Sequence, residues 1–110
     1  MAILAQRKCI PCSGEVPAMA SNSIEDLLKQ LAHNWKVVAG HHLLKSFTFP
    51  DFQMALEFTN KVGAVAEQEG HHPDIYLSWG RVEIKIWTHK IDGLTESDFI
   101  LAAKIEEIPH

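Results

Sequence analysis

The strongest constraint on the fold is a strict alternation of apolar and polar residues in the second half of the chain. Over residues 81–88, Val82, Ile84, Ile86 and Thr88 occupy every second position, and the positions between them are charged as far as Trp87. A shorter alternating run at 75–79 precedes this segment, and Gly80-Arg81 separates the two. Because successive side chains on a strand point to opposite faces, this pattern predicts a β-hairpin with one buried face.

Three other segments are expected to form helices. Apolar residues recur every three or four positions over 51–68, which indicates a helix with one buried face, and Gly70 is expected to end it. Ser23 is expected to begin the first helix, because an acidic residue follows it at the spacing of a capping box. Thr95 is expected to begin the last helix in the same way, with Asp98 as its capping partner.

These elements predict the fold class. Residues 35–39 and 43–49 alternate around a turn at Gly40-His41 and therefore predict a second hairpin. The expected order is α-β-β-α-β-β-α, an α+β fold in two layers, with a four-stranded antiparallel sheet and helices on one face. The single domain is expected to cover 23–110, and residues 1–22, which lack any sustained periodicity, are expected to form a flexible N-terminal arm.

Composition disfavours several classes of function. The net charge is −4 and the ten Lys and Arg residues are scattered, so neither nucleic acid nor a membrane surface is an expected partner. The apolar runs are too short to cross a bilayer, and the start of the chain lacks the pattern of a secretory signal. The two cysteines, Cys9 and Cys12, are expected as thiols on the arm, and the lack of a disulfide framework indicates a cytoplasmic protein.

Histidine is unusually frequent, with seven residues among 110. His71 and His72 lie between the 51–68 helix and the following strand, and His89 follows the strand that pairs with it. Gly80, at the turn of this hairpin, lies midway between His71 and His89. Strand pairing is therefore expected to bring His89 beside the His71-His72 connection.

Three interpretations of this cluster follow from the residues alone. The histidines could act as general acids and bases, with Glu67 orienting one imidazole. They could bind a metal ion with an open fourth position, or they could be solvated side chains at the end of a sheet. Pro73 stiffens the connection, which suits a preorganised site. The remaining histidines are expected at the surface: His33, His41, His42 and His110.

Several motifs of the chain resemble those of the pterin-4a-carbinolamine dehydratases. The matching segments are Glu67 to Asp74, Trp79-Gly80-Arg81-Val82, Thr88-His89, Gly93-Leu94-Thr95, Asp98 and Leu101-Ala102, with Trp35 and Phe47 to Phe52 before them. The resemblance covers about residues 23–108, and a His-His-Pro-Asp segment followed at this distance by Thr-His is highly specific. The cysteine-bearing arm resembles an extension found in some bacterial members.

The resemblance implies an activity. Such proteins dehydrate 4a-hydroxytetrahydrobiopterin, the carbinolamine that an aromatic amino-acid hydroxylase leaves behind, to quinonoid dihydropterin, and so recycle tetrahydropterin. The family uses no metal and no organic cofactor, which disfavours the metal interpretation. A link to such a hydroxylase and a homodimer or homotetramer are also implied. The alternative is a non-catalytic protein-binding role, as a dimerisation cofactor in transcription or an assembly factor.

The resemblance also implies roles for individual residues. His71 and His89 match family histidines and are expected to transfer protons, and His72 is expected to bind and position the pterin. Glu67 matches an acidic residue that supports the site, whereas some members have an acidic residue where this chain has Gly70. Further supporting or substrate-binding residues are expected at Pro73, Asp74, Trp79 and Trp87.

Overall fold

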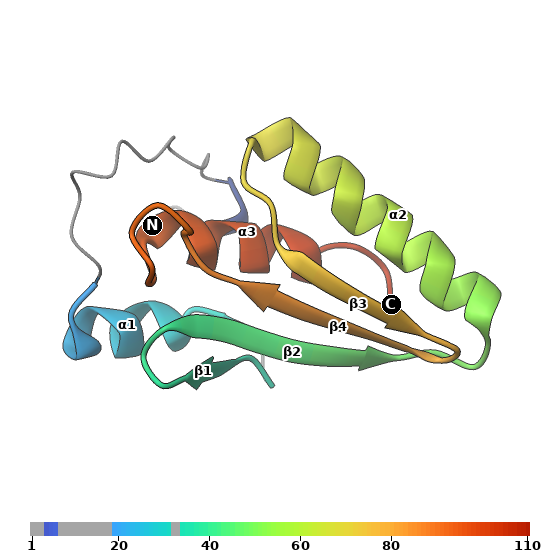
Figure 1. The fold of residues 1–110 in the computed structure, drawn as a ribbon, viewed down its shortest axis with the longest axis horizontal. Helices are drawn as coiled ribbons and strands as arrows, with labels where there is room; N and C mark the ends of the chain where they lie inside the picture. The colour runs from blue at the N-terminus through green and yellow to red at the C-terminus, as the bar shows by residue number, and fades with distance from the viewer. Residues whose placement is uncertain (1–3, 7–18, 32–33) are drawn as a thin grey trace.

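The computed structural model describes residues 4–6, 19–31 and 34–110, and its helices and strands follow the predicted order (Figure 1). A short 3-10 helix, η1, precedes them. The elements are η1 (Leu4–Gln6), α1 (Ser21–Leu28), β1 (Lys36–Val38), β2 (His42–Thr48), α2 (Phe52–Glu69), β3 (Asp74–Ser78), β4 (Arg81–Ile86) and α3 (Glu96–Glu106). None of the helices in these ranges is long and apolar enough to cross a membrane.

The four strands form one antiparallel sheet in the order β1-β2-β4-β3. In the predicted hairpin, Asp74 pairs with Lys85 and Ser78 with Arg81, so that Trp79 and Gly80 form a two-residue turn. Helix α2 packs against β3 and β4, and α3 packs against β2 and α2. The predicted α+β class, with a four-stranded antiparallel sheet, is therefore confirmed.

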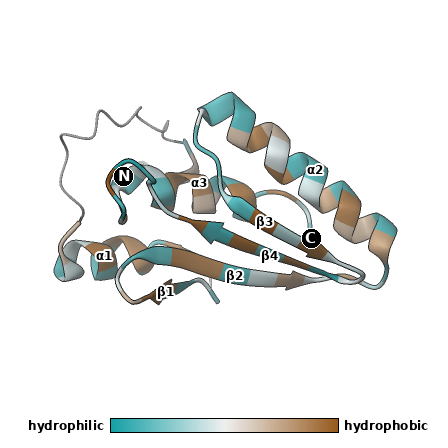
Figure 2. Cartoon of the chain, in the orientation of Figure 1, coloured by the Kyte–Doolittle hydropathy of each residue, from teal (hydrophilic) through white to brown (hydrophobic). Residues whose placement is uncertain are grey.

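Alternation along the strands separates the core from the exposed face of the sheet. Val82, Ile84 and Ile86 of β4 are fully buried, whereas the residues between them are partly exposed. Figure 2 shows this alternation of hydrophobic and hydrophilic residues along β4. Leu43 and Phe47 of β2 pair with Ile86 and Val82 and extend the same buried face. Burial of such aliphatic and aromatic side chains is the main favourable term in folding.

One charged residue of β2, Lys45, lies on this buried face. Its side chain is only 9% exposed, and its ammonium group forms an ion pair with Glu106 near the end of α3. The same Glu106 carboxylate accepts a hydrogen bond of 2.8 Å from the Trp35 indole N–H. The Lys45 ammonium also lies 4.7 Å from the centre of the Phe47 ring. The pair and its ring contacts compensate the cost of burying the charge and tie β2 to α3.

The first helix differs from the prediction. Helix α1 begins at Ser21 and its N-cap is Ala20, which makes no side-chain hydrogen bond, so the predicted start at Ser23 is wrong. Ser23 lies within the first turn, because the Ile24 N–H bonds to the Ala20 carbonyl. The boundary expected at residue 22 therefore falls inside this helix. Within the expected arm, Leu4 of η1 is buried and packs with the core, whereas Cys9 and Cys12 lie outside the described residues.

Gly80 provides a test of the hairpin turn. A Cβ atom at this position would lie 2.8 Å from the Phe49 carbonyl oxygen, whose own residue donates its N–H to the Gly80 carbonyl. We expect Gly80→Ala to lower the free energy of unfolding by about 1–3 kcal/mol, because backbone must shift to admit the methyl group. Chemical denaturation measures this change.

The matched control is Gly63→Ala in α2. A Cβ atom there meets nothing within 4 Å, so alanine is expected to stabilise the helix by about 0.5–1 kcal/mol. A Gly80→Ala variant as stable as the Gly63→Ala variant would contradict this account of the turn.

Candidate active site

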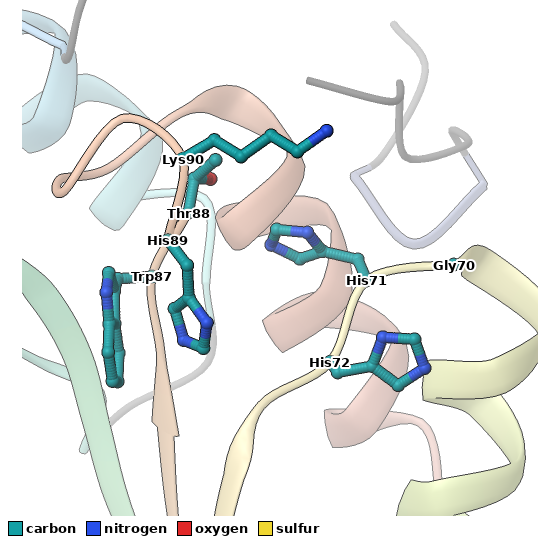
Figure 3. Close-up of a pocket in the computed structure, with 7 residues that line it drawn as sticks. All are labelled: Gly70, His71, His72, Trp87, Thr88, His89 and Lys90. Carbon is teal, nitrogen blue, oxygen red and sulfur yellow. The ribbon is translucent and has the colours of Figure 1, made fainter. Parts of the chain in front are cut away.

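The connection from α2 to β3 holds the first two histidines. Gly70 ends α2 in the left-handed conformation, with φ 64° and ψ 27°, and the His71 N–H still bonds to the Ala66 carbonyl at 3.2 Å. From there the chain runs without further helix or turn into β3. Figure 3 shows the His71 and His72 rings pointing in different directions from this connection, as expected for neighbouring residues on an extended backbone.

The third histidine begins a short loop after β4. Thr88 and Gly93 form an isolated antiparallel bridge, and the Thr88 carbonyl accepts hydrogen bonds from the N–H groups of Ile91 and Asp92. These bonds close the 88–93 loop on itself. Because β3 and β4 pair antiparallel, this loop lies at the same end of the sheet as the His71-His72 connection. The juxtaposition that the hairpin predicts is therefore present (Figure 3).

The two segments enclose a cavity of about 300 Å³. The residues that line it are Gly70, His71, His72, Trp87, Thr88, His89 and Lys90. Among the residues predicted for the site, the structure thus brings together His71, His72, His89 and Trp87. It places Glu67, Pro73 and Asp74 on the flanking elements, outside the lining. Trp79 is 68% exposed in the hairpin turn, at the opposite end of β3 and β4 from the cavity.

A buried carboxylate, Asp98, organises the site. Its side chain is fully buried, and its Oδ1 lies 2.5 Å from His71 Nε2. The other oxygen, Oδ2, accepts hydrogen bonds from the Thr88 hydroxyl at 2.9 Å and from the Thr95 N–H at 2.8 Å. An ionised carboxylate only accepts hydrogen bonds, so Nε2 of His71 carries the hydrogen. When this imidazole is neutral, its Nδ1 therefore holds an available lone pair.

Sequence reasoning missed this role of Asp98. It assigned the residue to the cap of α3, where the Thr95 N–H does bind its side chain, but not to the histidine. The sequence did contain a signal for this contact. A capping carboxylate has a second oxygen that can bind another donor, and the predicted hairpin places Thr88 near His71. Glu67, which was predicted to orient one imidazole, lies 3.5 Å from His72 Nε2, and both side chains are largely exposed.

His89 lies in a different environment from His71. Its ring centre is 4.2 Å from that of Trp87 at an interplanar angle of 45°, and no described residue forms a hydrogen bond with the ring. The cavity thus presents one imidazole that a buried carboxylate orients and another that contacts an indole ring at a tilted angle. Such a pair can accept a proton at one point of a ligand and donate a proton at another.

Structural and catalytic metal ions are usually held by three or four protein ligands. Within the described ranges, no group of three or more His, Cys, Asp or Glu side chains is placed to hold one metal ion.

The tautomer of His71 tests the role of Asp98. An asparagine has one side-chain oxygen, which Thr88 and Thr95 would occupy, so its amide would present N–H groups to His71. We expect Asp98→Asn to convert neutral His71 from the Nε2–H to the Nδ1–H tautomer, as measured by long-range ¹H–¹⁵N spectroscopy of the imidazole rings. The control is Glu67→Gln, which alters the neighbour of His72. Unchanged His71 signals in Asp98→Asn would show that the carboxylate does not set the tautomer.

The sequence and the fold are similar to those of known proteins. The model of the family described as pterin 4 alpha carbinolamine dehydratase matches residues 17–108. A protein of Rickettsia bellii, provisionally named a pterin-4-alpha-carbinolamine dehydratase, is 56% identical over 103 residues, or 94% of this chain and 91% of that protein.

Two solved structures have a similar fold. One is a transcriptional coactivator/pterin dehydratase from Brucella melitensis, with a TM-score of 0.75 and 30% identity over 81% of this chain and 95% of that chain. The other is a pterin dehydratase-like protein identified as a RuBisCO assembly factor in the alpha-carboxysome, with a TM-score of 0.58 and 24% identity. The second covers 67% of this chain and 87% of that chain, and its likeness is one of fold alone.

Proposed function

The chain belongs to the pterin-4-alpha-carbinolamine dehydratase family of hydro-lyases, and we propose that it dehydrates 4a-hydroxytetrahydrobiopterin by histidine acid–base catalysis. One observation carries the mechanism. His71 and His89 come from two different segments and line one cavity, and a buried carboxylate orients the first of them. The cavity volume of about 300 Å³ lies at the lower end of the range for small-molecule sites.

The reaction needs two proton transfers and no redox change. The C4a–O bond of the carbinolamine breaks, and its hydroxyl leaves as water after receiving a proton. The N5–H bond also breaks, and its electron pair forms the C4a–N5 double bond of the quinonoid dihydropterin. A base must accept the N5 proton while an acid protonates the hydroxyl, so two groups that titrate near neutral pH suit the reaction.

The environments of the two histidines favour one assignment of roles. His71 is the base, because its Nε2–H is held by Asp98 and its Nδ1 lone pair can accept the N5 proton. Asp98 then stabilises the imidazolium that forms, since the carboxylate lies 2.5 Å from the ring. His89 is the acid that protonates the leaving hydroxyl. His72 and Trp87, which line the same cavity, bind and position the pterin.

Nothing in this chemistry requires a metal ion or an organic cofactor, because each step moves only a proton. We therefore propose that the chain uses neither a metal ion nor an organic cofactor, and that the pterin acts only as its substrate. We place the reaction in the cytoplasm, since a chain with two cysteines has no disulfide framework. There it would recycle the pterin of an aromatic amino-acid hydroxylase.

Self-association is the second part of the proposal. Several large apolar side chains are at least 36% exposed: Val38, Phe52, Met54, Leu56, Tyr76 and Trp79. A small domain that leaves such residues in water gains from covering them with a second copy. We propose a homodimer or homotetramer, which analytical ultracentrifugation distinguishes from a monomer.

A stopped-flow assay tests the activity. With freshly generated 4a-hydroxytetrahydrobiopterin, and after subtraction of the uncatalysed reaction, we expect wild-type chain to accelerate dehydration. His71→Ala and His89→Ala are expected to lower kcat by about 10²–10⁴, because each removes one proton-transfer group. His71→Gln, whose amide can still donate to Asp98, checks that the loss does not come from unfolding.

The controls separate the alternatives. His110→Ala removes a histidine that contacts Phe58 rather than the cavity, and activity is expected to remain at the wild-type level. EDTA is expected to have no effect. A wild-type chain no faster than buffer would overturn the enzyme proposal and favour a protein-binding role. Loss of activity in EDTA, restored by a divalent ion, would overturn the metal-free mechanism.

A further inference from the structure

Two histidines that the mechanism above does not use lie close to the cavity. His41 is the last residue of the turn between β1 and β2, and His42 is the first residue of β2; Ala39 and Gly40 in this turn both have positive φ angles, of 53° and 63°. Because β2 pairs with β4 up to Leu43 and Ile86, this turn lies at the same end of the sheet as the 88–93 loop. His41 and His42 were expected simply as surface residues, and both are half-buried.

Hydrogen bonds join this pair to the loop that carries His89. His41 Nε2 lies 2.7 Å from Asp92 Oδ1, and His41 Nδ1 lies 3.0 Å from His42 Nδ1. The carboxylate only accepts, so His41 donates through Nε2. With both rings neutral, the Nδ1–H of His42 therefore donates to Nδ1 of His41. The two histidines and Asp92 form a continuous chain from the β1–β2 turn to the 88–93 loop.

The charge state of His42 supports this arrangement. Partial burial lowers the pKa of His42 below the ordinary histidine value, and the neighbouring Lys85 and His41 lower it further. The neutral form of His42, in which one ring nitrogen carries the hydrogen, is therefore favoured. The groups that face the pair are Lys85 of β4 and Asp92 of the loop.

The same pair contacts Trp87. The Trp87 ring centre lies 5.5 Å from that of His41, 6.2 Å from that of His42 and 4.2 Å from that of His89. Figure 3 shows the Trp87 ring standing beside the His89 ring in the cavity. Since no described residue hydrogen-bonds to the His89 ring, its orientation depends on this tilted ring contact and on the backbone of the loop.

We propose that His41 and His42 are positioning residues, which hold Trp87 and the 88–93 loop so that the His89 imidazole faces the substrate. Neither residue lines the cavity, so both act through Trp87 and Asp92. The kinetic part of this inference rests on the proposed function, whereas the orientation of His89 can be measured without substrate.

Variants at Asp92 test this proposal most directly. Its side chain is 86% exposed, so its replacement leaves the core intact, and its φ of 55° suits both glycine and asparagine. Asp92→Gly removes the acceptor for His41, whereas Asp92→Asn retains a side-chain oxygen that can accept the same hydrogen bond. The double variant His41→Leu/His42→Leu removes the whole pair. The matched control is His110→Leu, another histidine in ring contact with neighbours, in this case Phe47 and Phe58.

The first readout is the NMR spectrum of the His89 ring. In wild-type chain, we expect the carbon-bound ring protons to be displaced by the ring current of Trp87. In Asp92→Gly and in the double variant, they are expected to move toward the positions of solvated histidine. They are expected to stay in place in Asp92→Asn and His110→Leu. His89 signals that are unchanged in the double variant would overturn the proposal.

The second readout is the split between kcat and KM. We expect the double variant and Asp92→Gly to lower kcat by about tenfold with KM nearly unchanged, because a misplaced acid slows the chemical step rather than binding. Asp92→Asn is expected to restore kcat. A kcat equal to that of wild type in the double variant would overturn the kinetic role. An inactive wild-type chain would instead contradict the proposed function, and the His89 signals would still decide whether the pair positions this ring.

Discussion

The cavity depends on the hydrogen bonds of one buried carboxylate. Asp98 binds the start of α3 through the Thr95 N–H, the end of the β4 segment through Thr88, and the α2–β3 connection through His71. These three segments are distinct in sequence, and each supplies a donor to the same side chain. A charged group in the core is stable only when such donors surround it, so the segments and the carboxylate fix one another.

This arrangement gives the two halves of the cavity different degrees of constraint. On one side, the backbone ends α2 at Gly70 and the imidazole of His71 is held through Nε2. On the other side, the 88–93 loop is closed by its own backbone hydrogen bonds, and His89 rests on Trp87. In the proposed mechanism, the constrained imidazole of His71 would take a proton from the ring of the substrate, and the more exposed imidazole of His89 would protonate the departing hydroxyl.

Most of the fold could be predicted because its signals are local. The alternation over 81–88 indicated a strand, and the midpoint position of Gly80 brought His71 and His89 to one end of the sheet. The contact between His71 and Asp98 was missed, since the local signals leave open how α3 packs against the sheet. The start of α1 was wrong because a capping pattern at Ser23 is a weak signal, and an uncapped turn before it forms equally well. The contacts of His41 and His42 with Trp87 depend on how the β1–β2 hairpin lies beside β4, so no pattern within one segment could predict them.

All residues that line the cavity, together with Asp98, lie between positions 70 and 98. They therefore belong to one continuous stretch of chain, in which α3 follows the β3–β4 hairpin directly in sequence. Short sequence separation makes such contacts fast to form, because little loop entropy is lost before they are made. The contacts around the cavity can thus form within this one stretch, with less loop entropy lost than in a site assembled from distant parts of the chain.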